Sequence, residues 1–135
     1  MTDLKTYFEN TEGIGVLATA DAEGRVDAAV YSRPHFMEDG TLAFIMRDRL
    51  THRNLQSNPH AAYLFIEKGE GFQGMRLFLT KTHEETDSNL IEKLRRRHDR
   101  PKDPEGVAIR FLVYFKLDKT LPLIGGDSKT KIKST

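Results

Sequence analysis

The sequence predicts a mainly β fold: a small antiparallel β-barrel of six to seven strands with peripheral helices. Strand-length apolar segments recur along the chain and are separated by short turns rich in Gly and Asp. Some of these segments alternate apolar and polar residues, as Met75, Leu77 and Leu79 do. Few segments show the periodicity of a helix. Many strands with few helices favour a closed barrel over a layered α/β fold.

The strands are expected at residues 14–20, 25–31, 35–37, 41–46, 60–67, 72–80 and 107–116. The first two form a hairpin around the turn at Asp21–Gly24. Pro34 cannot donate a hydrogen bond to a neighbouring strand, so it places a bulge or an edge before the third strand. From these turns, the first strands are expected to follow one another in an unbroken antiparallel series.

Three helices are expected. The first spans residues 2–9, and the second follows the strand at 41–46 and stops before Pro59. The third begins at a capping box, Thr82 to Glu85, and runs to His98. Residues 99–106 are expected to be a loop, residues 121–124 to pack on the domain, and residues 128–135 to be a flexible tail.

Length and composition limit the possible classes of protein. A chain of 135 residues is expected to form one domain, residues 1–135. With 0 Cys, thiol catalysis, disulfides and Cys-ligated metals are excluded. A net charge of +1 gives no overall attraction to nucleic acid or anionic membranes. The start lacks the basic residues of a signal peptide, and no apolar run approaches the ~18 residues of a membrane span. A cytoplasmic protein is therefore expected.

The stretch from Thr41 to Pro59 contains the best candidate site. Its first half is an apolar run typical of a strand buried on both faces. Its second half places Arg, Thr and Asn side chains where a helix begins, and backbone N–H groups at a helix N-terminus bind anions. In the alternative interpretation, Asp48 or Thr51 only caps the helix and Arg47, Arg49 and Arg53 are solvated surface charges.

Other catalytic and metal-binding motifs are missing. The sequence contains no Gly-x-Ser-x-Gly, P-loop or Gly-x-Gly-x-x-Gly motif. None of the 5 His residues is paired with a carboxylate four residues away in the form of a metal site, so no metal is expected. Tyr31 and Tyr63 lie in apolar strands, where packing is the expected role.

The order of these segments resembles the pyridoxamine 5′-phosphate oxidase-like, flavin-binding split-barrel family over about Phe8 to Leu117. The matching pieces are residues 15–19, the turn at 21–24, Asp39-Gly40 before residues 41–46, Thr51-His52-Arg53-Asn54-Leu55, Asn58-Pro59 and the strand at 60–66. The resemblance implies a split barrel with an FMN site at a homodimer interface.

The resemblance also implies which residues bind the cofactor. The FMN phosphate would contact Arg49, Leu50, Thr51 and Asn54, with Arg33 as a second cation. The flavin ring would lie along Tyr31-Ser32-Arg33-Pro34 and Ile45-Met46-Arg47, where strand edges offer backbone donors to its carbonyls. The implied function is that of an FMN-dependent oxidoreductase, with a small-molecule substrate or NAD(P)H as partner. The flavin supplies the hydride chemistry, so no acid–base residue is assigned.

Two alternatives remain at this stage. Within the same fold, the protein is a flavin carrier or a relative that binds a deazaflavin or haem. In a different class, Arg95, Arg96, Arg97, Arg100 and Lys102 form a nucleic-acid-binding segment. The near-zero net charge and the absence of interleaved aromatic residues argue against nucleic acid. The basic residues at the end of the third helix are instead placed as the helix dipole favours.

Overall fold

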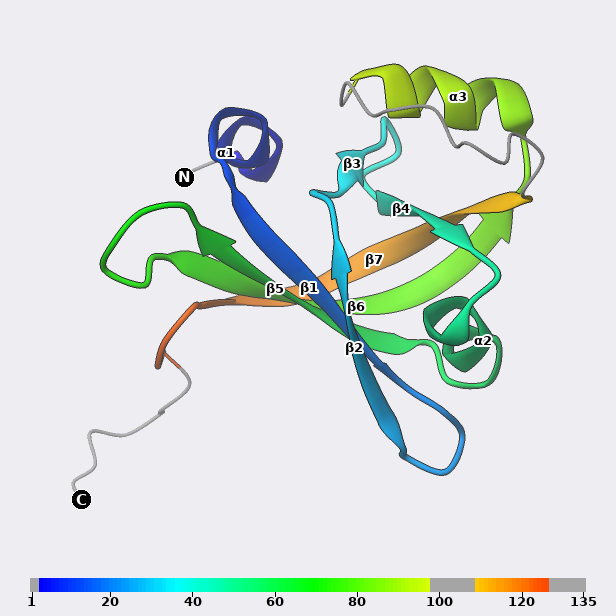
Figure 1. The fold of residues 1–135 in the computed structure, drawn as a ribbon, viewed down its shortest axis with the longest axis horizontal. Helices are drawn as coiled ribbons and strands as arrows, with labels where there is room; N and C mark the ends of the chain where they lie inside the picture. Colours follow the sequence, from blue (N-terminus) through cyan, green and yellow to red (C-terminus); the bar gives the residue numbers. More distant parts are fainter. Residues whose placement is uncertain (1–2, 98–108, 127–135) are drawn as a thin grey trace.

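The structure is a computed structural model of the 135-residue chain and describes residues 3–97 and 109–126. Its elements are α1 (Leu4–Asn10), β1 (Gly13–Ala20), β2 (Val26–Tyr31), β3 (His35–Phe36), β4 (Leu42–Arg47), α2 (Leu50–Ser57), β5 (His60–Glu67), β6 (Gly74–Glu85), α3 (Ser88–Arg97) and β7 (Arg110–Pro122). The strands form one antiparallel sheet in the order β2-β1-β5-β6-β7-β4-β3. The sheet curls into a half-barrel (Figure 1), which confirms the prediction of a mainly β split barrel.

The strand order differs from an unbroken series of hairpins. β5 pairs with β1, and β4 pairs with β7 rather than with β5. The edge strands β2 and β3 are not paired with each other, so the barrel is split. Tyr63 bridges this region, because its hydroxyl donates to the Ser32 carbonyl at 3.1 Å. Gly15 makes room for the Tyr63 ring, since a Cβ there would lie 1.9 Å from the Tyr63 hydroxyl.

The concave face of the sheet holds the main core. Alternation along the strands turns Leu17, Tyr63 and Leu77 to this face, where all three are fully buried. Phe8 of α1 packs on Phe65 with ring centroids 4.9 Å apart, and Leu55 of α2 joins the same cluster. The two helices therefore cover the concave face.

Within residues 3–97 and 109–126, the convex face is covered at one end only. Ile91 and Leu94 of α3 pack against Leu112 and Tyr114 of β7. At the other end, no described helix lies on the convex side of β2, β1 and β5 (Figure 1). We call them the outer-face patch: Ile14, Val16, Ala18, Ala20, Val26, Ala28, Val30, Ala62, Leu64 and Ile66. Within it, Ile14, Val26 and Val30 are 60%, 83% and 75% exposed.

Some element boundaries differ from the predictions. Thr82 to Glu85 is not a capping box but the end of β6, because Glu84 and Glu85 pair with β7. α3 begins at Ser88, and the Asp87 carboxylate accepts from the Leu90 N–H at 3.1 Å. β6 begins at Gly74 rather than residue 72, because Phe72 lies in the turn with a φ of 51°.

β7 extends beyond the predicted strand to Pro122, so Leu121 pairs with Arg76 of β6. The predicted loop at 99–106, the predicted start of the last strand at 107 and the predicted tail at 128–135 lie outside the described residues. No helix in the described part of the chain is long and apolar enough to cross a membrane.

Candidate functional site

The N-terminus of α2 lacks a side-chain cap. β4 ends at Arg47, and Arg49 occupies the N-cap position without a capping hydrogen bond from any described side chain. Asp48 and Thr51, the caps of the alternative interpretation, have other partners: Asp48 contacts His52, and the Thr51 hydroxyl donates to Asp27. The first-turn N–H groups therefore point at a place where an anion can accept from them, beside the exposed Arg49.

α2 is held firmly on the sheet. Asn54 is buried, and its side-chain amide donates to the Thr19 hydroxyl of β1 at 3.0 Å. Thr51 is also buried. Asn54 was predicted to contact a phosphate, but in the structure its side chain joins α2 to β1. Asn54 therefore contributes to the site by fixing the position of α2 on the sheet.

Four predicted or newly found side chains meet beside α2. The Thr51 hydroxyl donates to the Asp27 carboxylate at 3.2 Å. The Tyr31 ring packs edge-on against Phe44, with centroids 6.1 Å apart. Burial raises the pKa of Tyr31, and contact with Thr51 and the charge of Arg49 partly oppose the rise. The structure thus brings Tyr31, Arg49 and Thr51 together, with Asp27 as an additional member.

Sequence reasoning missed Asp27. The signal was present, because Asp27 shares the concave side of β2 with Ala29 and Tyr31 and is the charged residue in that row. A carboxylate at an inward strand position needs a partner. Here the partner is Thr51, but only the three-dimensional structure shows that α2 reaches it.

The strand edges around the site are open. β3 pairs with β4 only at Leu42 and Ala43, and no described strand pairs with Phe44–Arg47 on that side. Met46 points into the main core, and Ile45 packs on the α3 side of the sheet. Ile45 and Met46 were predicted to contact the flavin ring, but only their backbone groups face the open edge of β4. A flat ligand with carbonyl groups can use such an edge.

Of the remaining predicted residues, Arg33 lies away from the N-terminus of α2. Arg33 donates to the carbonyls of Phe8 and Thr11 at 2.9 and 2.8 Å, at the C-terminal end of α1. α1 and α2 lie at opposite ends of β1, so this protomer does not bring Arg33 to Arg49 (Figure 1). Leu50 and Ser32 are exposed, Pro34 is buried, and Arg47 is half-buried.

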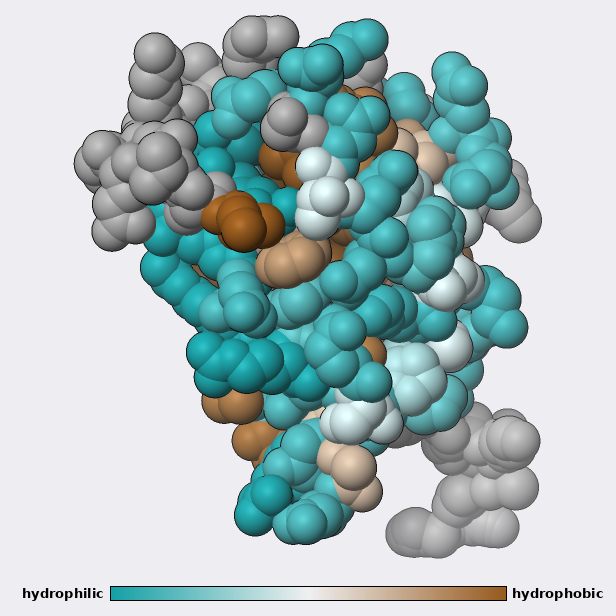
Figure 2. Space-filling model, turned by 90° about the vertical axis from the view of Figure 1, so that its right-hand side faces the viewer, coloured by the Kyte–Doolittle hydropathy of each residue, from teal (hydrophilic) through white to brown (hydrophobic). Residues whose placement is uncertain are grey.

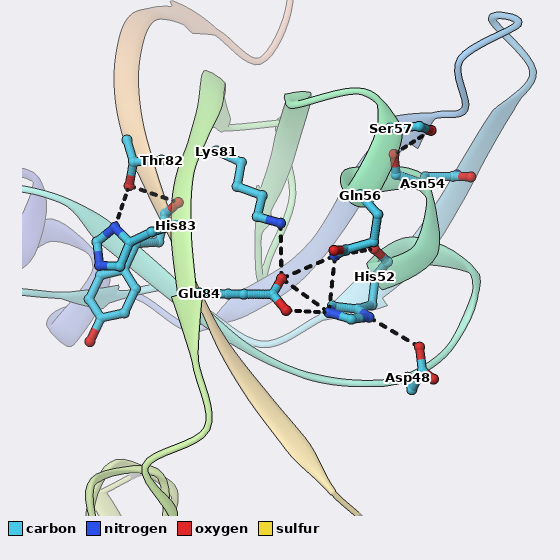
Figure 3. A network of polar contacts seen from close by, with 10 residues as sticks. Asp48, His52, Asn54, Gln56, Ser57, Lys81, Thr82, His83 and Glu84 are labelled. Carbon is cyan, nitrogen blue, oxygen red and sulfur yellow. Dashed lines mark hydrogen bonds and ion pairs between the residues drawn. The ribbon is translucent and has the colours of Figure 1, made fainter.

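A charged network joins α2 to β6 (Figure 3). The ring of the buried His52 lies between two carboxylates, 3.1 Å from Asp48 through Nδ1 and 3.0 Å from Glu84 through Nε2. Lys81 and Gln56 also donate to Glu84, at 2.9 and 3.1 Å. Burial raises the pKa of Glu84, but hydrogen bonds from His52, Lys81 and Gln56 outweigh it and hold that pKa at about 2.

The network contains one His–carboxylate pair with a spacing of four residues, Asp48 and His52. However, no group of three or more His, Asp or Glu residues in the described part of the chain could hold a metal ion.

The side of the molecule that carries α2 and α3 is mostly hydrophilic (Figure 2). Within the basic cluster at the end of α3, the side chain of Arg95 is only 12% exposed. Arg95 is paired with Glu92 at 2.7 Å, whereas Arg100 and Lys102 lie outside the described residues. The interpretation of this cluster as a nucleic-acid site therefore gains no support from the geometry of Arg95.

The fold resembles several solved structures. An FMN-binding protein from Syntrophomonas wolfei subsp. wolfei has a TM-score of 0.70 and 19% identity, covering 89% of this chain and 83% of that chain. An F420 reductase has a TM-score of 0.67 and 20% identity, covering 89% and 98%. The haem storage protein HutZ from Vibrio cholerae has a TM-score of 0.60 and 19% identity, covering 87% and 90%. These likenesses show a shared fold.

No curated protein matches this chain in sequence. The family model described as pyridoxamine 5′-phosphate oxidase matches residues 1–113, which is most of the 135-residue chain. The protein therefore belongs to the pyridoxamine 5′-phosphate oxidase family.

Proposed function

We propose that this protein is a cytoplasmic FMN-binding flavoprotein, an oxidoreductase that works as a homodimer. The observation that carries the proposal is the uncapped N-terminus of α2, which lies beside Arg49, Tyr31 and the open edge of β4 in a member of this family. An anion-binding helix end next to open strand edges suits a ligand with a phosphate at one end and a flat polar ring at the other.

The residues at α2 fit a phosphate group. Arg49 is exposed and offers a guanidinium fork, and the first-turn N–H groups offer neutral donors. Thr51 offers a hydroxyl, which would have to turn away from Asp27 to reach the ligand. The Asp27 carboxylate repels a phosphate dianion, so the affinity depends on both this repulsion and the attraction to Arg49.

The residues along the strand edges would orient the flavin ring. When bound, FMN supplies hydride transfer between a donor such as NAD(P)H and a small-molecule substrate. The backbone of Ile45–Arg47 offers polar groups along the β4 edge, and the half-buried Tyr31 lies next to that edge against Phe44. These groups bind and position the cofactor, and no side chain is assigned as an acid or base.

The outer-face patch supports the homodimer. It consists of apolar residues from three adjacent strands, and contiguous apolar surfaces of this kind mark protein interfaces. β2 contributes to both features, because Val26 and Val30 lie in the patch while Asp27 and Tyr31 face the site. A second copy on the patch would place the site next to the subunit interface.

The test is to identify the bound cofactor. Purified protein is expected to be yellow, with flavin absorbance and an extracted ligand of the mass of FMN. NADH or NADPH should then bleach the flavin if the protein is an oxidoreductase; bound FMN that neither nicotinamide reduces supports a flavin carrier instead. A colourless protein that takes up no added FMN in a fluorescence titration would refute the cofactor.

A second candidate is a deazaflavin or haem protein of the same fold, because the structural relatives include an F420 reductase and a haem storage protein. Haem gives a strong Soret band, and a deazaflavin lacks the long-wavelength flavin band. Absorbance and mass of the extracted ligand therefore separate the three cofactors.

A further inference from the structure

The position of His52 restricts its protonation state. Each ring nitrogen lies within 3.1 Å of a carboxylate, Asp48 on one side and Glu84 on the other. The imidazole is stacked on Phe111, with centroids 4.0 Å apart, and its side chain is 7% exposed. The ring is therefore held in place and has little access to water.

Charged carboxylates can only accept hydrogen bonds. A neutral imidazole has one N–H and one lone pair, so one of its two nitrogens would face a carboxylate without a proton between them. The Gln56 amide nitrogen also lies 3.1 Å from His52 Nε2, but its two hydrogens are directed to the Glu84 carboxylate and the His52 carbonyl. The imidazolium ion satisfies both contacts at once. The low pKa of Glu84 agrees with a carboxylate that remains charged beside it.

The groups around His52 come from α2, β6, β7 and the turn that precedes α2. Asp48 precedes α2, Glu84 and Lys81 lie on β6, and β7 contributes Phe111 and the adjacent Arg110, which has an interaction of its own. On α2, Gln56 donates to both Glu84 and the His52 carbonyl, and Arg53 reaches the Asp48 carbonyl at 3.4 Å. In the core of this network, Lys81 and protonated His52 balance Asp48 and Glu84. Loss of the His52 proton leaves one negative charge unbalanced.

His52 lies in the first turn of α2, two residues after its start at Leu50. We infer that His52 is a positioning residue: in its doubly protonated form it clamps α2 to β6, and loss of that proton weakens both the clamp and anion binding at the α2 N-terminus. The second part rests on the proposed function, because it assigns the anion to the FMN phosphate.

The clamp itself can be tested without a ligand. In wild-type protein, side-chain nitrogen NMR should show both His52 ring nitrogens protonated at pH 5.5. As the ring loses its proton at higher pH, hydrogen exchange of the α2 amides should accelerate. A ring that is a single neutral tautomer throughout pH 5.5–8, or α2 protection that does not follow its titration, would overturn the inference.

The coupling to anion binding is tested with FMN and riboflavin across the same pH range. The FMN phosphate itself titrates near pH 6, and this affects both proteins equally. The informative quantity at each pH is therefore the affinity of wild type divided by the affinity of His52→Gln. This ratio should fall by roughly two- to five-fold from low to high pH for FMN and stay constant for riboflavin, because only FMN carries the phosphate. A ratio constant for both flavins contradicts the coupling.

His60→Gln is the matched control, because His60 is exposed on β5 and outside this network. It should behave as wild type. If His52→Gln fails to fold, Glu84→Gln removes the opposite carboxylate and should give the same change in ratio. If wild-type protein binds no FMN at any pH, both the flavin site and the coupling are refuted. The ligand-free NMR and hydrogen-exchange data then still test whether protonated His52 holds α2 on β6.

Discussion

Two side chains of opposite charge flank the proposed phosphate position. Arg49 and Asp27 both act electrostatically on Tyr31, and Asp27 also accepts from Thr51. A site with only cations would hold any phosphate tightly. A carboxylate next to the cation reduces the affinity for a dianion, so the strength of binding depends on both residues.

Arg49→Ala should weaken FMN binding. The substitution removes a charge-assisted hydrogen-bonding group worth roughly 1.5–3 kcal/mol, which is about one to two decades in Kd. Riboflavin, which lacks the phosphate, should bind both forms alike in the same titration. Lys93→Ala removes an exposed cation of α3 and serves as the control. If Arg49→Ala changes the affinities for both flavins equally, the phosphate lies elsewhere, and Arg33 becomes the next candidate.

Asp27→Asn should have the opposite effect. It removes a negative charge but keeps a side-chain oxygen that can accept from Thr51. We expect FMN to bind about five-fold more tightly, corresponding to about 1 kcal/mol of relieved repulsion in a partly exposed site, with riboflavin unaffected. Isothermal titration measures both affinities. Weaker FMN binding by Asp27→Asn would mean that the carboxylate accepts a hydrogen bond from the ligand instead.

At the scale of elements, α2 is positioned by three different kinds of contact. Leu55 packs in the main core, Asn54 bonds to Thr19 of β1, and His52 bonds to Glu84 of β6. The helix is therefore fixed to strands on both sides of it. This arrangement keeps the first turn in place without using its N–H groups.

Glu84→Gln should make the free energy of unfolding less dependent on pH in the acid range. The folded-state pKa of about 2 lies below the ordinary value of 4.5, so the charged carboxylate stabilises the fold above about pH 4.5, and this stabilisation is lost as the pH falls toward 2. Urea unfolding at pH 6 should show Glu84→Gln less stable by on the order of 3 kcal/mol, and the difference should shrink with acidification.

The control for this measurement is Glu92→Gln on α3, whose carboxylate is half-exposed and pairs with Arg95. It should change the free energy of unfolding by less than ~1 kcal/mol. A stability difference between wild type and Glu84→Gln that stays constant from pH 6 to pH 2 would contradict the role given to the Glu84 charge.

The elements differ in how far the sequence predicts them. Strand-length apolar segments between turns located all seven strands, and some of them alternate because a strand with one buried face repeats every second residue. The boundary at Thr82–Glu85 was wrong because the same four residues satisfy both a capping box and a strand, and only pairing with the distant β7 decides between them.

The candidate site divides in the same way. Arg49 and Thr51 are close in sequence, so the pattern alone placed them together. Asp27 and Glu84 are 24 and 32 residues from their partners Thr51 and His52, and they arrive there through strand register. Sequence periodicity gives the face of each strand but not its neighbours, which is why these two carboxylates were not predicted.

At the scale of the whole molecule, the two faces of the sheet differ in how far helices cover them. In the described part of the chain, α1 and α2 cover the concave face, and α3 covers the β4–β7 end of the convex face. No described element covers the outer-face patch, and three of its aliphatic side chains are at least 60% exposed. An isolated protomer with such a surface is prone to associate, and a two-fold axis lets the same patch cover itself.

Val30→Glu should therefore convert a dimer into a monomer. Wild-type protein is expected to sediment at about twice the 15.4 kDa chain mass. Val30 is 75% exposed within one protomer, so the glutamate leaves the protomer core intact but would be buried uncompensated in the dimer. Ile124→Glu makes a comparable change at a site 68% exposed and outside the patch, and it should remain dimeric. If FMN binds between subunits, Val30→Glu should also lose FMN affinity while keeping its circular dichroism spectrum. A monomeric wild type, or a Val30→Glu variant that remains dimeric, would remove the patch as the interface.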